Sequence, residues 1–82
     1  MENTKVIEKV SFQLCSVPNS EGLVLELSEG DEPAFLEVRV DSDNVRWFRF
    51  FSSEKHLAIT MEDVERAIQV AKKEVINTSI EM

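Results

Sequence analysis

Residues 23–51 read LVLELSEGDEPAFLEVRVDSDNVRWFRFF and contain three apolar segments separated by two polar turns. In the first two segments apolar residues occupy alternate positions, which is the period of a β-strand with one buried face. The separating residues, 30–33 and 41–44, have the Gly, Pro, Asp and Asn composition of tight turns. Because connections this short favour sequential antiparallel neighbours, the stretch predicts three consecutive strands of one antiparallel sheet.

The first two of these strands each place aliphatic side chains on one side. The side expected to face the core carries Leu23, Leu25, Leu27, Leu36, Val38 and Val40. The opposite side carries the mixed set Glu26, Phe35, Glu37 and Arg39. The sequence therefore predicts one covered face and one exposed face of the sheet.

The third strand, residues 45–51, is aromatic on both sides. Phe48 and Phe50 fall on the side expected to form the core, whereas Trp47, Arg49 and Phe51 fall on the other. This strand has no purely apolar face, so we expect both of its sides to be at least partly covered.

A further strand is predicted before this stretch. Apolar residues alternate over residues 5–17, and the polar segment 18–22, with its Pro and Gly, ends the pattern. The sheet is therefore expected to have four strands.

The sequence after the sheet predicts an amphipathic helix. Thr60 has the character of an N-cap, and Asp63 completes a capping box three residues later. Apolar residues then recur every three or four positions from Val64 to about Asn77. The predicted fold is α+β, a four-stranded antiparallel β-meander with one C-terminal α-helix packed on the core face, which includes Phe48 and Phe50 (β-β-β-β-α).

The composition predicts one small acidic domain. The chain has 82 residues, with 16 acids against 9 bases, and a formal net charge of -7. We expect a single domain over residues 1–82 with an ordered core of about residues 4–77 and short frayed ends. A single cysteine, no long apolar segment and no apolar leader at the N-terminus predict a cytoplasmic protein without a membrane span. Oligomerisation remains as a way to stabilise so small a core, so a homodimer is expected as an option.

The residues that carry chemistry predict neither an enzyme nor a metal or cofactor site. Cys15 and His56 are the only residues of their kinds, which leaves no zinc site of the Cys/His type within one chain. The segment 52–56 contains Ser and His but no strained turn or glycine around a nucleophile. Glu26 and Glu37 are expected to be cross-strand neighbours, yet a two-layer domain of this size offers little room for a catalytic pocket.

The acids are unevenly distributed along the chain. Between residues 21 and 43 the sequence has eight acids and a single base, Arg39; these acids are Glu21, Glu26, Glu29, Asp31, Glu32, Glu37, Asp41 and Asp43. A negative potential on the turns before and after the strand at 34–40 would attract a basic partner and speed its encounter. The same charges also keep strand edges soluble.

The segment 46–51 has the opposite character, because bases alternate with aromatics there. Such a strand can form a stacking platform for single-stranded nucleic acid. The β-β-β-β-α order over about residues 23–76, with Leu57-Ala58-Ile59-Thr60 leading into the helix, resembles the single-strand-binding domain of the PC4 coactivator family. That resemblance implies a dimer that binds nucleic acid through a basic sheet face, from which this chain departs in its acidic charge, and a net charge of -7 opposes phosphate binding.

The leading prediction is a non-enzymatic binding protein that neutralises a basic partner directed at nucleic acid. Immunity proteins paired with nuclease toxins and phage antagonists of antiviral defence are proteins of this type. We expect Glu29, Asp31, Glu32, Asp41 and Asp43 to steer the partner, and Trp47, Arg49 and Phe51 to anchor it. The alternatives are a nucleic-acid-binding module that uses Arg39, Arg46, Trp47, Arg49 and Phe51, and a structural homodimer that hides the aromatic face.

Overall fold

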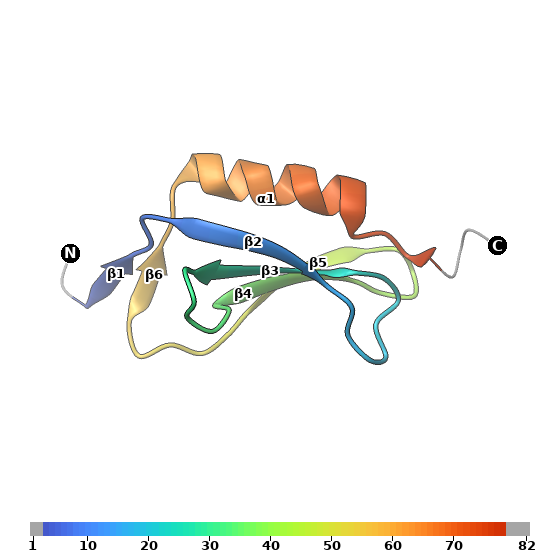
Figure 1. Ribbon diagram of the computed structural model, residues 1–82, viewed down its shortest axis with the longest axis horizontal. Helices are drawn as coiled ribbons and strands as arrows, with labels where there is room; N and C mark the ends of the chain where they lie inside the picture. The colour runs from blue at the N-terminus through green and yellow to red at the C-terminus, as the bar shows by residue number, and fades with distance from the viewer. Residues whose placement is uncertain (1–2, 79–82) are drawn as a thin grey trace.

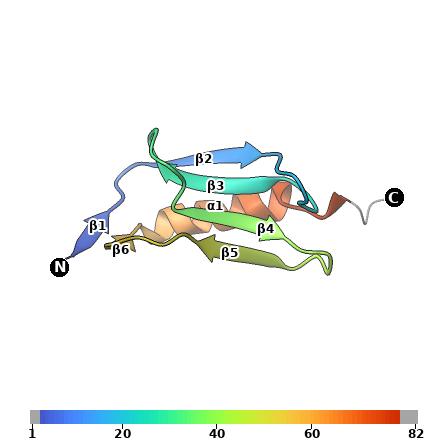
Figure 2. The ribbon, with the colours of Figure 1, turned by 90° about the horizontal axis from the view of Figure 1, so that it is seen from below.

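The computed structural model describes residues 3–78 and confirms the predicted α+β fold (Figures 1 and 2). A four-stranded antiparallel sheet has the order β2-β3-β4-β5, and one helix lies on one of its faces. The strands are β2 (Val10–Cys15), β3 (Val24–Glu29), β4 (Leu36–Val40) and β5 (Arg46–Phe50), and the helix is α1 (Met61–Glu74). The predicted frayed ends extend into residues 1–2 and 79–82, which lie outside the described part.

The N-terminal strand predicted over residues 5–17 is confirmed only in its second part, β2, because the structure divides the segment into two strands. β1 (Thr4–Val6) leaves the main sheet and pairs in parallel with β6 (His56–Ala58), a short strand between β5 and the helix. Ile7 is buried directly after β1, and its N–H donates to the carbonyl of Ala58 at 2.9 Å. This contact between distant segments interrupts the alternation before β2 begins.

The core lies between α1 and the face of the sheet that the alternation predicts. From the sheet it contains Leu25, Leu27, Leu36, Val38 and Val40, and from the helix and its end Ala67, Ala71 and Val75. The helix contacts β3 and β2 most closely. The small helix residues allow it to approach this half of the sheet, which leaves the β5 side less covered.

Several predicted burials are corrected by this placement of the helix. Phe48 and Phe50 were expected beneath α1, yet their exposed fractions are 39% and 73%. Leu23 is exposed because β3 starts one residue later. Val24 alternates with the leucines, which places it on the face expected to be uncovered, yet it is fully buried. Phe35, also assigned to that face, precedes β4 and packs against the core.

The helix begins as predicted and ends earlier. The Thr60 hydroxyl accepts a hydrogen bond from the Asp63 backbone N–H at 3.1 Å, as an N-cap does. The helix stops at Glu74 rather than near Asn77, and the following residues are fastened to the loops below. The Asn77 side-chain amide donates to the carbonyl of Asp41 at 2.9 Å, and the Thr78 N–H donates to the carbonyl of Glu21 at 3.0 Å.

Arg46, at the start of β5, holds the C-terminal end of α1. Its Nε donates to the carbonyl oxygens of Val75 at 2.8 Å and Ala71 at 3.1 Å, and its Nη2 donates to that of Lys72 at 3.3 Å. The Ala71 carbonyl also accepts the Val75 N–H at 2.8 Å. The last carbonyls of a helix lack the full set of ladder partners, and a cation there also complements the helix dipole. One side chain therefore connects the edge strand to the helix.

We expect Arg46→Gln to lower the free energy of unfolding by about 1–2 kcal/mol, because the helix end loses its charged donor. The matched control is Lys73→Gln, which removes a base from the same helical turn without these hydrogen bonds and should cost less than about 0.5 kcal/mol. Urea denaturation followed by circular dichroism measures both. Equal losses in the two variants would show that Arg46 has no special part in holding α1.

Candidate functional site

β5 is an edge strand of the sheet, and all five of its residues are exposed. Its neighbour on one side is β4, with Val38 opposite Phe48 and Glu37 opposite Arg49. The other edge is free in the described part of the chain (Figure 2). β5 is thus the most accessible regular element of the sheet.

The two faces of β5 have different chemistry. Phe48 and Phe50 lie on the side of α1, whereas Trp47 and Arg49 lie on the face that the helix leaves free. Phe51 follows the strand, and the guanidinium of Arg49 lies 5.7 Å from the centre of its ring. Arg46 was expected to take part in the nucleic-acid-binding alternative, but it binds the end of the helix on the other side. It therefore does not contribute to a nucleic-acid platform.

Glu37 organises the charges of the free face. It was expected to be exposed there, yet it is 3% exposed, since it lies between two arginines. Its Oε1 accepts hydrogen bonds from Arg39 Nε at 2.6 Å and from Arg49 Nη1 at 3.3 Å. Glu26 is its cross-strand neighbour, as predicted. Because both guanidiniums share one carboxylate, the three groups carry a net positive charge and are held in place.

Trp47 is fixed by the turn beside it. The indole N–H donates to Asp41 Oδ2 at 2.8 Å, while Asp41 Oδ1 accepts the backbone N–H groups of Asp43 and Val45 at 2.9 Å each. The hydrogen bond from Trp47, followed by that from Val45, holds the pKa of the Asp41 carboxyl below its ordinary value of 3.8. Although 59% exposed, the indole is therefore oriented before any partner binds.

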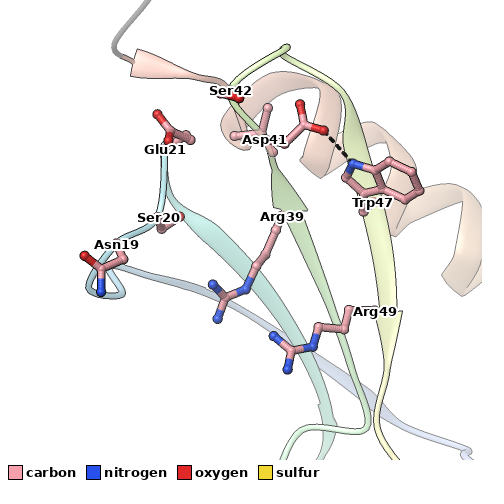
Figure 3. A pocket seen from close by; sticks show the side chains of 9 residues that line it. Asn19, Ser20, Glu21, Arg39, Asp41, Ser42, Trp47 and Arg49 are labelled. Atoms are coloured by element: carbon pink, nitrogen blue, oxygen red, sulfur yellow. Dashed lines mark hydrogen bonds between the residues drawn. The ribbon is translucent and has the colours of Figure 1, made fainter.

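A hollow of about 380 Å³ lies on the free face beside Trp47 (Figure 3). The guanidiniums of Arg39 and Arg49 lie on one side of it and the β2–β3 loop on the other; its lining is Asn19, Ser20, Glu21, Arg39, Val40, Asp41, Ser42, Trp47 and Arg49. Sequence reasoning missed Asn19 and Ser20. The sequence does not indicate that the polar β2–β3 turn, which is distant from β5 along the chain, lies close to it in space. Only Gly22 indicates a close contact in this loop. A Cβ there would overlap the carbonyl oxygen of Ile76, so glycine is required where this loop meets the C-terminal segment.

The structure divides the predicted acidic residues between the two ends of the sheet. Glu29, Asp31 and Glu32 lie at the β3–β4 turn, whereas Asp41 and Asp43 lie at the β4–β5 turn, because successive turns of an antiparallel meander alternate between ends. Two of the five acids have internal roles. Glu29 pairs with Lys5 at 3.1 Å, and Asp41 holds Trp47.

The residues considered for catalysis lie apart from this surface. Partial burial, and then the nearby Glu26 carboxylate, raise the pKa of the Cys15 thiol above its ordinary value of 9.0, so the thiol is protonated at neutral pH. His56 is exposed in β6, where its backbone N–H donates to the carbonyl of Asn3. Among residues 3–78 no three His, Cys, Asp or Glu side chains are grouped to hold a metal ion, and no helix has the length and apolar character to cross a bilayer.

The Trp47–Asp41 hydrogen bond predicts a pH-dependent fluorescence change. Because the folded-state pKa of Asp41 is lowered, the interaction is fully present above the ordinary value of 3.8 and is lost as pH falls through the lower folded-state value. Trp47, the single tryptophan, should change its emission with a midpoint below pH 3.8. Circular dichroism identifies any overlap with unfolding, and Asp41→Asn, which keeps an acceptor but does not titrate, should remove the step. A midpoint at or above 3.8, or an unchanged step in Asp41→Asn, would contradict this assignment.

Comparisons with protein-family models, with curated proteins and with solved structures find no match to this chain. Its function has therefore to be inferred from the side chains themselves. They place a free edge strand of aromatic residues between two acidic turns.

Proposed function

We propose that the protein is a non-enzymatic binding protein of the cytoplasm that neutralises a basic partner. The observation that carries the proposal is β5, an edge strand with every residue exposed and an acidic turn at the end nearer Asp43. The other acidic turn, with Asp31 and Glu32, lies at the opposite end of the sheet, on the side of Phe51. Aromatic side chains at the centre and charges at the rim are the composition of a protein–protein interface.

The aromatic residues supply the anchors. Trp47, Phe50 and Phe51 are all exposed, and Trp and Arg are the types enriched among the residues that dominate binding energy. Trp47 is held by Asp41, and Arg49 by Glu37, so a partner meets side chains that have already lost much of their rotamer freedom. Pre-organisation of this kind reduces the entropic cost of binding.

The remaining acids supply electrostatic steering. Asp31, Glu32 and Asp43 are exposed, and their carboxylates form no ion pair within residues 3–78. Glu29 and Asp41 contribute through the negative field around them, although their carboxylates are engaged internally. Charges at an interface rim raise the rate of encounter with an oppositely charged protein.

The basic partner is proposed to act on nucleic acid. Proteins that contact the phosphate backbone carry clustered Lys and Arg, which an acidic protein can cover. A nuclease toxin or a defence factor has such a surface, so the protein would act as an immunity protein or as an antagonist of antiviral defence. The net charge of -7 favours this kind of partner over nucleic acid itself.

The immobilised protein should capture a basic protein from a lysate of the producing cell at low salt and release it as salt rises. Trp47→Ala should reduce capture at least tenfold, since it removes an anchor. The double variant Asp31→Asn, Glu32→Gln should lower the salt concentration needed for release. Gln69→Ala, on the exposed face of α1, is the matched control and should bind normally.

The captured protein should then act on nucleic acid in an assay, and the free acidic protein should inhibit that activity. Recovery of no basic protein, or capture that is insensitive to salt, would contradict the proposal.

A second candidate, a single-strand nucleic-acid module, is favoured by the hollow at Arg39, Trp47 and Arg49 (Figure 3). A base could stack on the exposed indole while the guanidiniums meet phosphate. Short oligonucleotides should then quench Trp47 fluorescence at low salt, and Arg39→Gln with Arg49→Gln should abolish the quenching. Arg66→Gln with Lys73→Gln, both on the helix, is the charge-matched control and should leave the quenching unchanged. Absence of quenching at micromolar protein would remove this candidate.

A further inference from the structure

The free edge of β5 has a defined set of unpaired backbone groups. The Asp41 N–H donates to the carbonyl of Val45 at 2.9 Å, and the Phe51 N–H donates to the carbonyl of Phe35 at 3.0 Å. Hydrogen bonding alternates along an antiparallel strand, so Trp47 and Arg49 direct their backbone groups toward β4. Arg46, Phe48 and Phe50 therefore direct their N–H and C=O groups outward.

Apart from its two arginines, this edge lacks the features that keep edge strands apart. The sequence of β5, RWFRF, contains no Lys, Pro, Gly or acid. The opposite edge strand, β2, is contacted by α1, with Arg66 5.8 Å from the ring of Phe12. An aromatic, uncovered edge is a template for pairing with another strand.

We propose that β5 pairs with β5 of a second copy of this chain, antiparallel and centred on Phe48. Among two-fold arrangements this register pairs all three outward-facing residues, Phe48 with the partner's Phe48 and Arg46 with the partner's Phe50. In the neighbouring two-fold registers the two strands slide by two residues relative to each other. One of the three outward-facing residues of each strand then has no partner. The two sheets then continue as one across the two-fold axis.

The side chains in this register are complementary. On the free face Trp47 lies opposite the partner's Arg49, a pair that allows a cation–π contact. Shifting the register toward Phe50 would place Arg49 opposite the partner's Arg49, which is unfavourable. Charge repulsion between the two β5 strands is small, because Arg46 is bound to helix carbonyls and Arg49 to Glu37 within each chain.

The surface available is near what a small specific dimer requires. Trp47, Phe48, Phe50 and Phe51 together expose about 400 Å² of aromatic surface, taking each side chain as about 200 Å². The strand backbone and the arginine stems extend this toward the roughly 600 Å² per partner of the smaller specific interfaces. A small core that takes its buried sheet residues from β3 and β4 and leaves β5 exposed gives the chain reason to gain stability from such an interface.

The self-pairing does not rest on the proposed function, because it is measured on the purified protein alone. Where both hold, a second copy and a basic partner compete for β5. A protein that stays monomeric while capturing a basic partner would overturn the self-pairing and leave the proposed function intact.

Sedimentation equilibrium should give twice the mass of one chain at micromolar concentration. Phe50→Lys should raise the dimer dissociation constant at least tenfold, since Phe50 is mostly exposed and the new charge lies opposite the partner's Arg46. Leu14→Lys, a comparably placed change on the other edge strand, should alter it less than twofold. Circular dichroism checks that each variant is folded. A monomeric wild type, or dissociation by Leu14→Lys instead, would overturn the proposal.

Disulfide cross-linking tests the register independently, in a Cys15→Ser background that removes the single native cysteine. Phe48→Cys should form a dimer under mild oxidation, because paired Cα atoms at this kind of position lie about 5.5 Å apart, within disulfide range. Phe50→Cys should link at least tenfold more slowly, because the partner's Phe50 lies four residues along the strand, roughly 14 Å away. Faster linking through Phe50→Cys, or equal rates, would overturn the register.

Discussion

A single helix covers about two strands, and this constraint determines which part of the molecule is available for binding. A helix is about 10–12 Å wide and neighbouring strands are about 4.8 Å apart. The four-stranded sheet could therefore accept two helices on one face, but it has only α1, which packs mainly against β3 and β2. Phe48 and Phe50 point to the covered side of the sheet, yet 39% and 73% of their surfaces remain exposed. The exposed aromatic strand follows from this mismatch between the layers.

The sequence predicts the elements whose pattern is local. The alternation of Leu36, Val38 and Val40 identifies β4 and its buried face, and Thr60 marks the start of α1, because each signal depends only on nearby residues. The break after β1 could not be predicted in the same way. It depends on a parallel pairing with β6, about fifty residues away, and on the hydrogen bond from Ile7 to Ala58.

The candidate site follows the same division between local and distant contacts. The aromatic character of β5 and the acidity of the turns are visible in the sequence, and the split of the acids between two ends was already implied by the predicted meander. The burial of Glu37 and the capture of the helix end by Arg46 were not predictable. Each depends on register and helix placement, which bring charged groups together across strands and layers. A net charge counts such groups as if they were all free.

An exposed aromatic edge has a cost that favours a partner. The unpaired backbone of Arg46, Phe48 and Phe50 is a template for aggregation, and the exposed rings weaken solubility. Yet the neighbouring contacts order this edge: Asp41 fixes Trp47, Glu37 fixes Arg49, and the helix end fixes Arg46. Ordering side chains in water loses entropy without burying apolar surface. A strand that is both costly to expose and already held in place has the properties that the two proposals require, whether the partner is a second copy or a basic protein.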